Sequence, residues 1–329
     1  MTTPTPTTSA PTRTRMVWMD ALRGIAILLI VLLHASVIAQ MAGLPVSRAI
    51  MSGNAFLEPF RIPLLMVLSG MLLGGSLRKG PGRYIVGKVR AILWPFAVWT
   101  LIVVLVFPYH GIDTILLALW APNTYLWYLH TLFLCYLVAL ALRRVPPIAA
   151  LLLSLLAGML VTLLPLSEEI ALMKPERTFT MLVCFFAGHW MMQNLDSVLA
   201  VTRRWWVTLL LALVGVGLGL LAISGTQVSN NPWLVLPLLG AIGAAVGLAQ
   251  RFTWSSWPLA WLRWVGRHSI IYYVTHWIVL DYALMALRHL PDWRGFVLVP
   301  ALVATAMLVG GLLALAERSI PPVRWLFRI

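Results

Sequence analysis

The chain has 329 residues, of which 61% are hydrophobic and only 10% are charged, and its mean hydropathy is +0.91. Soluble domains carry roughly 25% charged residues, so this composition excludes a water-soluble fold and makes lipid the solvent for most of the surface. The net charge of +14 does not indicate nucleic-acid binding. The basic residues of the chain lie in short loops between apolar runs, which is the pattern of a membrane protein.

Residues 1–15 are rich in Thr and Pro and have no apolar face, which predicts a disordered cytoplasmic tail. Apolar runs follow, each of roughly the 17–22 residues that cross a bilayer core. The sequence therefore predicts an all-α integral membrane protein with about ten transmembrane helices. We expect them at residues 22–39, 59–77, 91–108, 125–142, 148–165, 178–194, 205–223, 233–250, 269–287 and 296–316.

Two other segments and the two cysteines complete this outline. Residues 111–122 are too short to span and are expected to lie in the interface or to re-enter from outside, and residues 319–329 are expected to form a cytoplasmic tail. Cys135 and Cys184 both lie inside apolar runs. We expect them to pack as small hydrophobic residues, with neither a disulfide framework nor a metal site.

The distribution of basic residues predicts the orientation. With the N-terminus inside, the inner segments hold 17 of the 24 Lys and Arg residues and the outer loops hold five, while Arg23 and Arg61 fall at helix ends or within helices. Cytoplasmic loops carry an excess of Lys and Arg, so both termini are predicted to be cytoplasmic. An even number of helices agrees with this prediction.

Ionisable residues inside the apolar runs are candidate functional residues, because a charge at the bilayer centre costs about 2.5–3.5 kcal/mol or more. On the first helix, Arg23 lies at the cytoplasmic end and His34 lies eleven positions later, roughly 16 Å along the axis and on nearly the same face. Such an arginine can bind a phosphate, and such a histidine can act as a base. Equally, Arg23 can be a flanking charge and His34 a helix-packing residue.

Further ionisable residues lie on the second and ninth predicted helices. Arg61 follows Glu58 at an i,i+3 spacing near the outer interface, where the two can neutralise each other. His276 and Asp281 interrupt the ninth helix, with Asp281 at a depth comparable to that of His34. A carboxylate there can orient a catalytic imidazole or join two helices.

Three more features have simpler explanations. His130 and His189 are intramembrane, and we expect them to form interhelical hydrogen bonds. The inner loop before the third helix carries five basic residues, among them Lys88 and Arg90. These residues can set the membrane orientation and contact anionic lipid. Alternatively, they can form an electropositive entrance for a polyphosphate ligand.

Five motifs in order resemble the acyltransferase-3 family of membrane proteins. They are WMDALRGIAILLIVLLHAS with its Arg23 to His34 spacing, FRIPLLMVLSGMLLGG with Ser69 and Gly70, KVRAILWPF, the pair LWYLHTLF and FFAGHW, and GRHSIIYYVTHWIVL with Gly266, Ser269, Tyr273 and His276. The similarity runs from about residue 16 to 316, so residues 16–318 are assigned to an acyltransferase membrane domain. Leu65 and Met66 replace a Phe-Phe pair that is common in the family, and they keep its apolar bulk.

The resemblance implies transfer of an acyl group, usually acetyl, from cytoplasmic coenzyme A to a hydroxyl of a sugar or cell-envelope glycan in the bacterial cytoplasmic membrane. Arg23, Lys88 and Arg90 would bind the coenzyme A phosphates. His34 would act as general base or carry the acyl group. The remaining candidates are acceptor-binding or positioning residues, with Arg61 at the outer entrance: Arg61, Tyr273, His276 and Asp281.

A transporter or flippase of a lipid-linked or acylated sugar is the alternative, since it too would need intramembrane charges. It would also be expected to show an internal repeat, and none is evident in the sequence. The partners implied by the first interpretation are a coenzyme A thioester, a glycan or glycolipid acceptor and membrane lipids.

Overall fold

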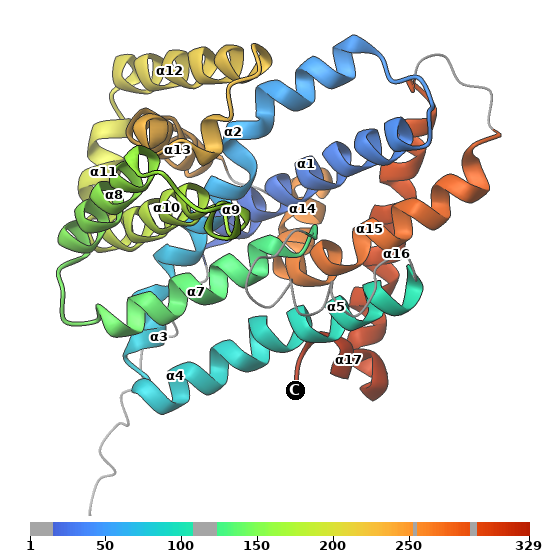
Figure 1. Ribbon diagram of the computed structural model, residues 1–329, viewed down its shortest axis with the longest axis horizontal. Coiled ribbons are helices and arrows are strands. Elements are labelled where there is room, and N and C mark those ends of the chain that lie inside the picture. Colours follow the sequence, from blue (N-terminus) through green and yellow to red (C-terminus); the bar gives the residue numbers. More distant parts are fainter. Residues whose placement is uncertain (1–15, 108–123, 253–254, 290–294) are drawn as a thin grey trace, which may run out of the picture.

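The computed structural model describes residues 16–107, 124–252, 255–289 and 295–329, and every regular element in these ranges is a helix. The long helices run side by side, with α12 and α13 at one edge, α5 and α17 at the opposite edge and α1 between them (Figure 1). In chain order the elements are α1 (Val17–Met41), α2 (Arg48–Met71), α3 (Leu73–Leu77), α4 (Pro81–Lys88), η1 (Val89–Leu93), α5 (Trp94–Val106), α7 (Trp127–Ala141), α8 (Pro147–Leu163), α9 (Glu168–Leu172), α10 (Pro175–Gln193), α11 (Leu195–Thr202), α12 (Trp205–Ile223), η2 (Val228–Asn230), η3 (Pro232–Leu234), α13 (Val235–Ala249), α14 (Trp257–Arg267), α15 (Ser269–Leu287), α16 (Leu298–Ser319) and α17 (Pro321–Phe327).

Within the described residues, six helices are long and apolar enough to cross a membrane. They are Val17–Met41, Pro81–Val106, Trp205–Ile223, Pro232–Ala249, Ser269–Leu287 and Leu298–Ser319. The other four predicted segments are also helical, in α2, α7, α8 and α10, of which α7 and α8 are shorter apolar helices. An all-helical multi-pass protein is therefore confirmed, whereas the count of ten spans and the cytoplasmic termini stay predictions.

Helix α2 begins eleven residues before the segment predicted from hydropathy, at Arg48 rather than at residue 59. Ser47 explains the early start, because its hydroxyl accepts a hydrogen bond from the Ile50 backbone N–H at 3.3 Å and caps the helix. Polar residues interrupt the apolar pattern over the first turns of α2, and hydropathy therefore missed them. Two other predicted segments, the tail 1–15 and the stretch 111–122, lie outside the described residues.

Two pairs of glycines hold the helices at the centre of the bundle together. A Cβ at Gly24 of α1 would lie 2.0 Å from the Leu262 carbonyl oxygen of α14, and one at Gly266 would lie 1.7 Å from the Asp20 carbonyl oxygen. The same reciprocal contact joins α2 and α10, since a Cβ at Gly70 or Gly188 would collide with the backbone of the other helix. Only glycine permits backbones to approach this closely. All four glycines belong to the motifs noted in the sequence.

A π-helical turn, η1, joins α4 to α5 and has a local cause. Pro95 has no N–H to donate to the carbonyl of Ala91 four residues earlier, and its ring would collide with that carbonyl. The chain widens into a π-turn over Val89–Leu93 and then continues as α5. This turn directly follows Lys88 and sets the direction in which the basic end of α4 faces the bundle.

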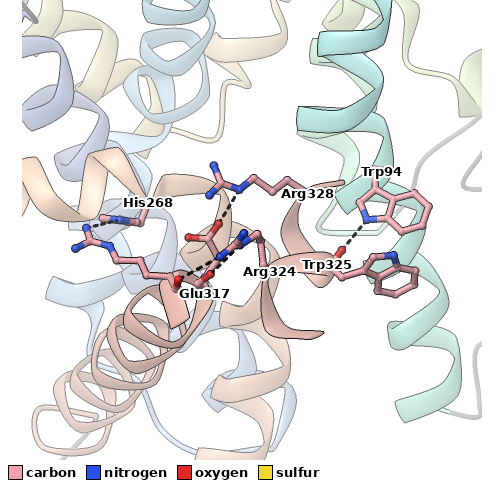
Figure 2. Close-up of polar contacts among 7 residues, drawn as sticks. Trp94, His268, Glu317, Arg324, Trp325 and Arg328 are labelled. Atoms are coloured by element: carbon pink, nitrogen blue, oxygen red, sulfur yellow. Dashed lines mark hydrogen bonds and ion pairs between the residues drawn. The ribbon is translucent and has the colours of Figure 1, made fainter. Parts of the chain in front are cut away.

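The C-terminal segment 319–329 contains α17, which packs against α5. The indole N–H of Trp94 donates to the Trp325 carbonyl oxygen at 2.7 Å, and Arg328 forms an ion pair with Glu317 of α16 at 2.9 Å (Figure 2). Trp99 of α5 stacks on Phe327, with ring centroids 5.6 Å apart. These contacts tie the last helix to α5 and α16.

Candidate active site

Two histidines from helices far apart in the sequence meet inside the bundle. His34 of α1 and His276 of α15 face each other, with Nδ1 of His34 2.9 Å from Nε2 of His276. Their rings are stacked, with centroids 4.9 Å apart and an angle of 29° between planes. His276 is buried, whereas His34 is partly exposed. His276 is thus enclosed by protein, while His34 keeps part of its surface accessible.

The backbone determines which ring nitrogens of this pair carry protons. Nδ1 of His276 lies 2.6 Å from the Tyr273 carbonyl oxygen. A carbonyl can only accept, so Nδ1 of His276 donates, and Nε2 of the neutral ring is an acceptor. Nδ1 of His34 must then be the donor to His276. The ring also bonds to the Ile30 backbone carbonyl, which can only accept from the same N–H, so the lone pair of the unprotonated Nε2 of His34 stays available.

Aromatic rings hold the histidine pair in place. The rings of Trp277 and His34 pack edge to face, with centroids 5.2 Å apart. The rings of Tyr125 and His276 pack in the same way, also with centroids 5.2 Å apart. Tyr125 and Trp277 stack on each other at an interplanar angle of 9°. The hydroxyl of Tyr273 donates to the backbone carbonyl of Tyr125. These contacts restrict rotation of both imidazoles and keep the surroundings largely apolar.

A cavity of 260 Å³ lies toward the end of α1 that carries Arg23, and neither histidine of the pair lines it. Three cationic side chains line it: Arg23 of α1, Lys88 of α4 and Arg267 of α14. Tyr273 lines it as well, and His276 follows Tyr273 by one helical turn, about 4.5 Å along α15. The cavity is therefore electropositive, and Tyr273 separates it from the histidine pair by one turn of α15.

Each cation in the cavity is held by a neighbour. The Lys88 ammonium lies 3.6 Å from the ring centre of Tyr136 and donates to the Ser76 hydroxyl at 3.2 Å. Arg23 is close to the Leu68 carbonyl oxygen, at 3.5 Å. Arg267 forms an ion pair with Asp20 at 3.2 Å. Only this last cation has a carboxylate partner among these contacts, so the cavity keeps a positive balance.

Two cations differ from the expectation for this region. Arg90, expected beside Lys88 at the electropositive entrance, is exposed and does not line the cavity, because two residues along a helix are rotated by about 200° and face opposite sides. Arg267 was expected only to be one of the basic residues of the inner segments, and it does line the cavity. Its position in the GRHS motif, next to Gly266, was the available signal.

The candidates on the outer side separate into two groups. Arg61 is buried and donates to the Asn54 carbonyl oxygen at 2.6 Å, while Asn54 donates to the Ser36 hydroxyl at 3.0 Å, two residues beyond His34 on α1. No ion pair joins Arg61 to Glu58 in the described part of the chain; Glu58 accepts instead from the Ser229 hydroxyl. Arg61 is thus linked to the outer end of α1.

Asp281 is partly exposed, and no hydrogen bond joins it to His34 in the part of the chain that the structure describes. The structure brings together His34, His276 and Tyr273 at the pair, and Arg23 and Lys88 in the cavity, and places Asp281 apart from both. A group of three His, Cys, Asp or Glu side chains able to hold a metal ion is absent from the described residues.

Comparison with known proteins identifies the family of the chain. A family model described as an acyltransferase domain matches residues 16–315, nearly the whole chain. Neither the curated proteins nor the solved structures contain a match to the chain. The matched range includes the glycine contacts, the cationic cavity and both histidines.

Proposed function

The chain belongs to the acyltransferase-3 family of acyltransferase domains, and on that premise we propose that it transfers an acyl group, acetyl in the first instance, from a coenzyme A thioester to a hydroxyl of a sugar or cell-envelope glycan. The observation that carries the proposal is a cationic cavity that reaches Tyr273, one helical turn before the His276 that holds His34. A binding site for a polyanion thereby lies near a base.

Donor binding follows from the charges of the cavity. Phosphate groups of coenzyme A would bind Lys88, Arg23 and Arg267, since charge-assisted hydrogen bonds from Arg and Lys are the usual phosphate contacts. The basic ends of α1 and α4 are the ends predicted to be cytoplasmic, where acyl-CoA is found. The long pantetheine arm would lie along the cavity and bring the thioester past Tyr273 toward His34.

His34 acts as the general base in this proposal. Nε2 takes the proton of the acceptor hydroxyl as its oxygen attacks the thioester carbonyl, and the C–S bond then breaks. The imidazolium formed on His34 returns the proton to the leaving thiolate, so the products are an O-acyl ester and free coenzyme A. His276 stabilises the imidazolium by accepting from its Nδ1–H. The apolar rings around the pair strengthen that hydrogen bond.

An acyl-histidine intermediate would give the same products by two steps through Nε2 of His34. The acceptor hydroxyl would then attack the acyl-histidine rather than the thioester. We place the acceptor on the outer side of the pair, near Arg61, and the whole protein in the bacterial cytoplasmic membrane. In this arrangement donor and acceptor approach His34 from opposite faces of the membrane.

The test uses purified, reconstituted protein and radiolabelled acetyl-CoA, followed by release of coenzyme A and by label on a glycan extract. We expect His34→Ala to lose about 100-fold or more of the rate, the contribution typical of a general base. Coenzyme A should still protect this variant against heat denaturation, since ligand binding to the native state raises stability. Label that stays on wild-type protein after denaturation would favour the acyl-histidine route.

His189→Ala is the matched control, since His189 is another histidine of the bundle and bonds only with Gln193 of its own helix, at 3.3 Å, among the described contacts. Its activity should remain close to that of the wild type. Full activity of His34→Ala would refute the mechanism. Folded wild-type protein without turnover or coenzyme A binding would favour another donor or the transporter alternative.

A further inference from the structure

A second polar cavity lies between α7 and α10 and is separate from the one assigned to the acyl donor. Its volume is 170 Å³, larger than a cavity that holds benzene, at about 150 Å³. The polar residues that line it are His130 and Thr131 of α7 and Arg177 and Thr178 of α10. They lie near the first turns of both helices, the ends that the charge distribution predicts to be outside.

Arg177 distinguishes this cavity from a simple packing defect. Only 8% of the residue is exposed, and its guanidinium carbon lies 4.0 Å from the ring centre of Trp127. Its Nε atom is buried without a hydrogen-bond partner, and no hydrogen bond or ion pair of this side chain is found in the described part of the chain. Glu176, the next residue, forms no ion pair with it there.

A buried arginine without a hydrogen-bonded partner leaves hydrogen-bond donors unsatisfied, among them Nε of Arg177 here. Guanidinium carries five N–H donors in a planar fork, and the face of one tryptophan satisfies none of them. The fork matches two oxygens of a carboxylate or a phosphate, which would supply both charge and acceptors. The positive end of the α10 dipole adds to the attraction for an anion, whereas Lys174, exposed just before α10, does not line the cavity.

A chain of side-chain interactions runs from Arg177 to the histidine pair. Arg177 and Tyr273 are close enough to interact electrostatically, and the Tyr273 hydroxyl donates to the backbone of Tyr125. The Tyr125 ring contacts His276. Tyr273 and Tyr125 therefore link Arg177 to the histidine pair.

We propose that this cavity binds an anionic group of the acceptor, a carboxylate or a phosphate on a sugar, through Arg177. The proposal rests on the proposed function, because it assigns the substrate class of the same reaction. It predicts that the acceptor is an acidic glycan or a phosphosugar, with the acidic group in the cavity and a hydroxyl at His34.

Heat denaturation in neutral detergent at constant ionic strength tests the proposal, with glucose, glucuronic acid and glucose 1-phosphate as probes. We expect one or both anionic sugars to raise the midpoint of wild type while glucose does not, and their comparison separates carboxylate from phosphate. Arg177→Gln should weaken that binding at least tenfold. Lys174→Gln, on the exposed rim, should change it less than threefold.

Equal stabilisation by glucose, or anion binding unchanged in Arg177→Gln, would overturn the proposal. A short-chain phosphatidylglycerol is the second arm, since a lipid headgroup offers the same phosphate chemistry. If that lipid stabilises the protein through Arg177 and neither anionic sugar does, the cavity is a lipid site and the acceptor assignment fails. If Arg177→Gln does not fold, Arg177→Lys replaces it, with weaker anion binding expected because lysine lacks the fork.

Acetyl-CoA protection and acyl transfer, measured on the same preparations, separate this proposal from the proposed function. Sugar binding that depends on Arg177, in protein that neither binds nor consumes acetyl-CoA, would mean that the enzymatic proposal alone has failed. Acyl transfer with equal efficiency to neutral and acidic sugars, unaffected by Arg177→Gln, would mean that the cavity proposal alone has failed.

Discussion

Replacing His276 by alanine removes the acceptor that lies 2.9 Å from Nδ1 of His34. In the proposed reaction that hydrogen bond becomes charge-assisted when His34 is an imidazolium. Hydrogen bonds to charged groups contribute about 1.5–3 kcal/mol. The neutral bond of the resting pair already contributes about 0.5–1.5 kcal/mol. Only the difference, about 1–1.5 kcal/mol, is lost from kcat, and at about 1.36 kcal/mol for each factor of ten it corresponds to a decrease of about 5- to 13-fold. Acetyl-CoA binding should stay unchanged, because His276 does not line the donor cavity.

His276→Gln is the informative partner variant. Its side-chain carbonyl can accept from His34 in place of Nε2, so we expect it to recover much of the activity that alanine loses. Steady-state kinetics with labelled acetyl-CoA would separate kcat from KM for wild type and both variants. Equal activity in His276→Ala and wild type would refute the positioning role. Equal losses in alanine and glutamine variants, with normal heat stability, would show that His276 does not act as an acceptor for His34.

Two other predictions concern the donor cavity and the helix contacts. Lys88→Gln should raise the KM for acetyl-CoA about tenfold or more through loss of a charge-assisted contact, whereas the exposed Arg90→Gln should change it less than threefold; equal effects would contradict the assignment of the cavity. Gly24→Ala and Gly266→Ala should each lower the stability in detergent by about 1–3 kcal/mol or more, because the added methyl would overlap backbone atoms. Gly217→Ala, where a Cβ meets no atom within 4 Å, should leave the denaturation midpoint nearly unchanged.

The helical architecture was readable from the amino-acid sequence. Apolar runs of bilayer length mark helices wherever burial in lipid requires every backbone group to bond within its own segment. The starts of two helices were exceptions. Ser47 caps α2 ahead of a stretch in which polar residues interrupt the apolar pattern, and the third predicted segment belongs to a helix that begins at Pro81 rather than at residue 91. The family was also readable, since its motifs are local strings of residues, and the match over residues 16–315 confirms that prediction.

The partner of His34 required the tertiary structure. His276 and Asp281 lie on one helix and were both candidates from their depth. Five residues on an α-helix correspond to a rotation of about 140°, so the two side chains cannot both face α1. Periodicity gives that angle but not which of the two faces the neighbouring helix. The packing of α1 against α15 decides it, and it selects His276.

The same distinction explains the two cavities. Lys88 and Arg90 were both assigned to the electropositive entrance, but two residues along a helix face opposite sides, and only packing shows that the side of Lys88 meets the cavity. Arg267 enters the donor cavity because Gly24 and Gly266 bring α14 against α1. Composition and spacing determine which segments are helices and which residues are costly to bury. Contacts between helices distant in the chain determine which of those residues meet, because each rotation and crossing is set by packing between side chains that no local pattern records.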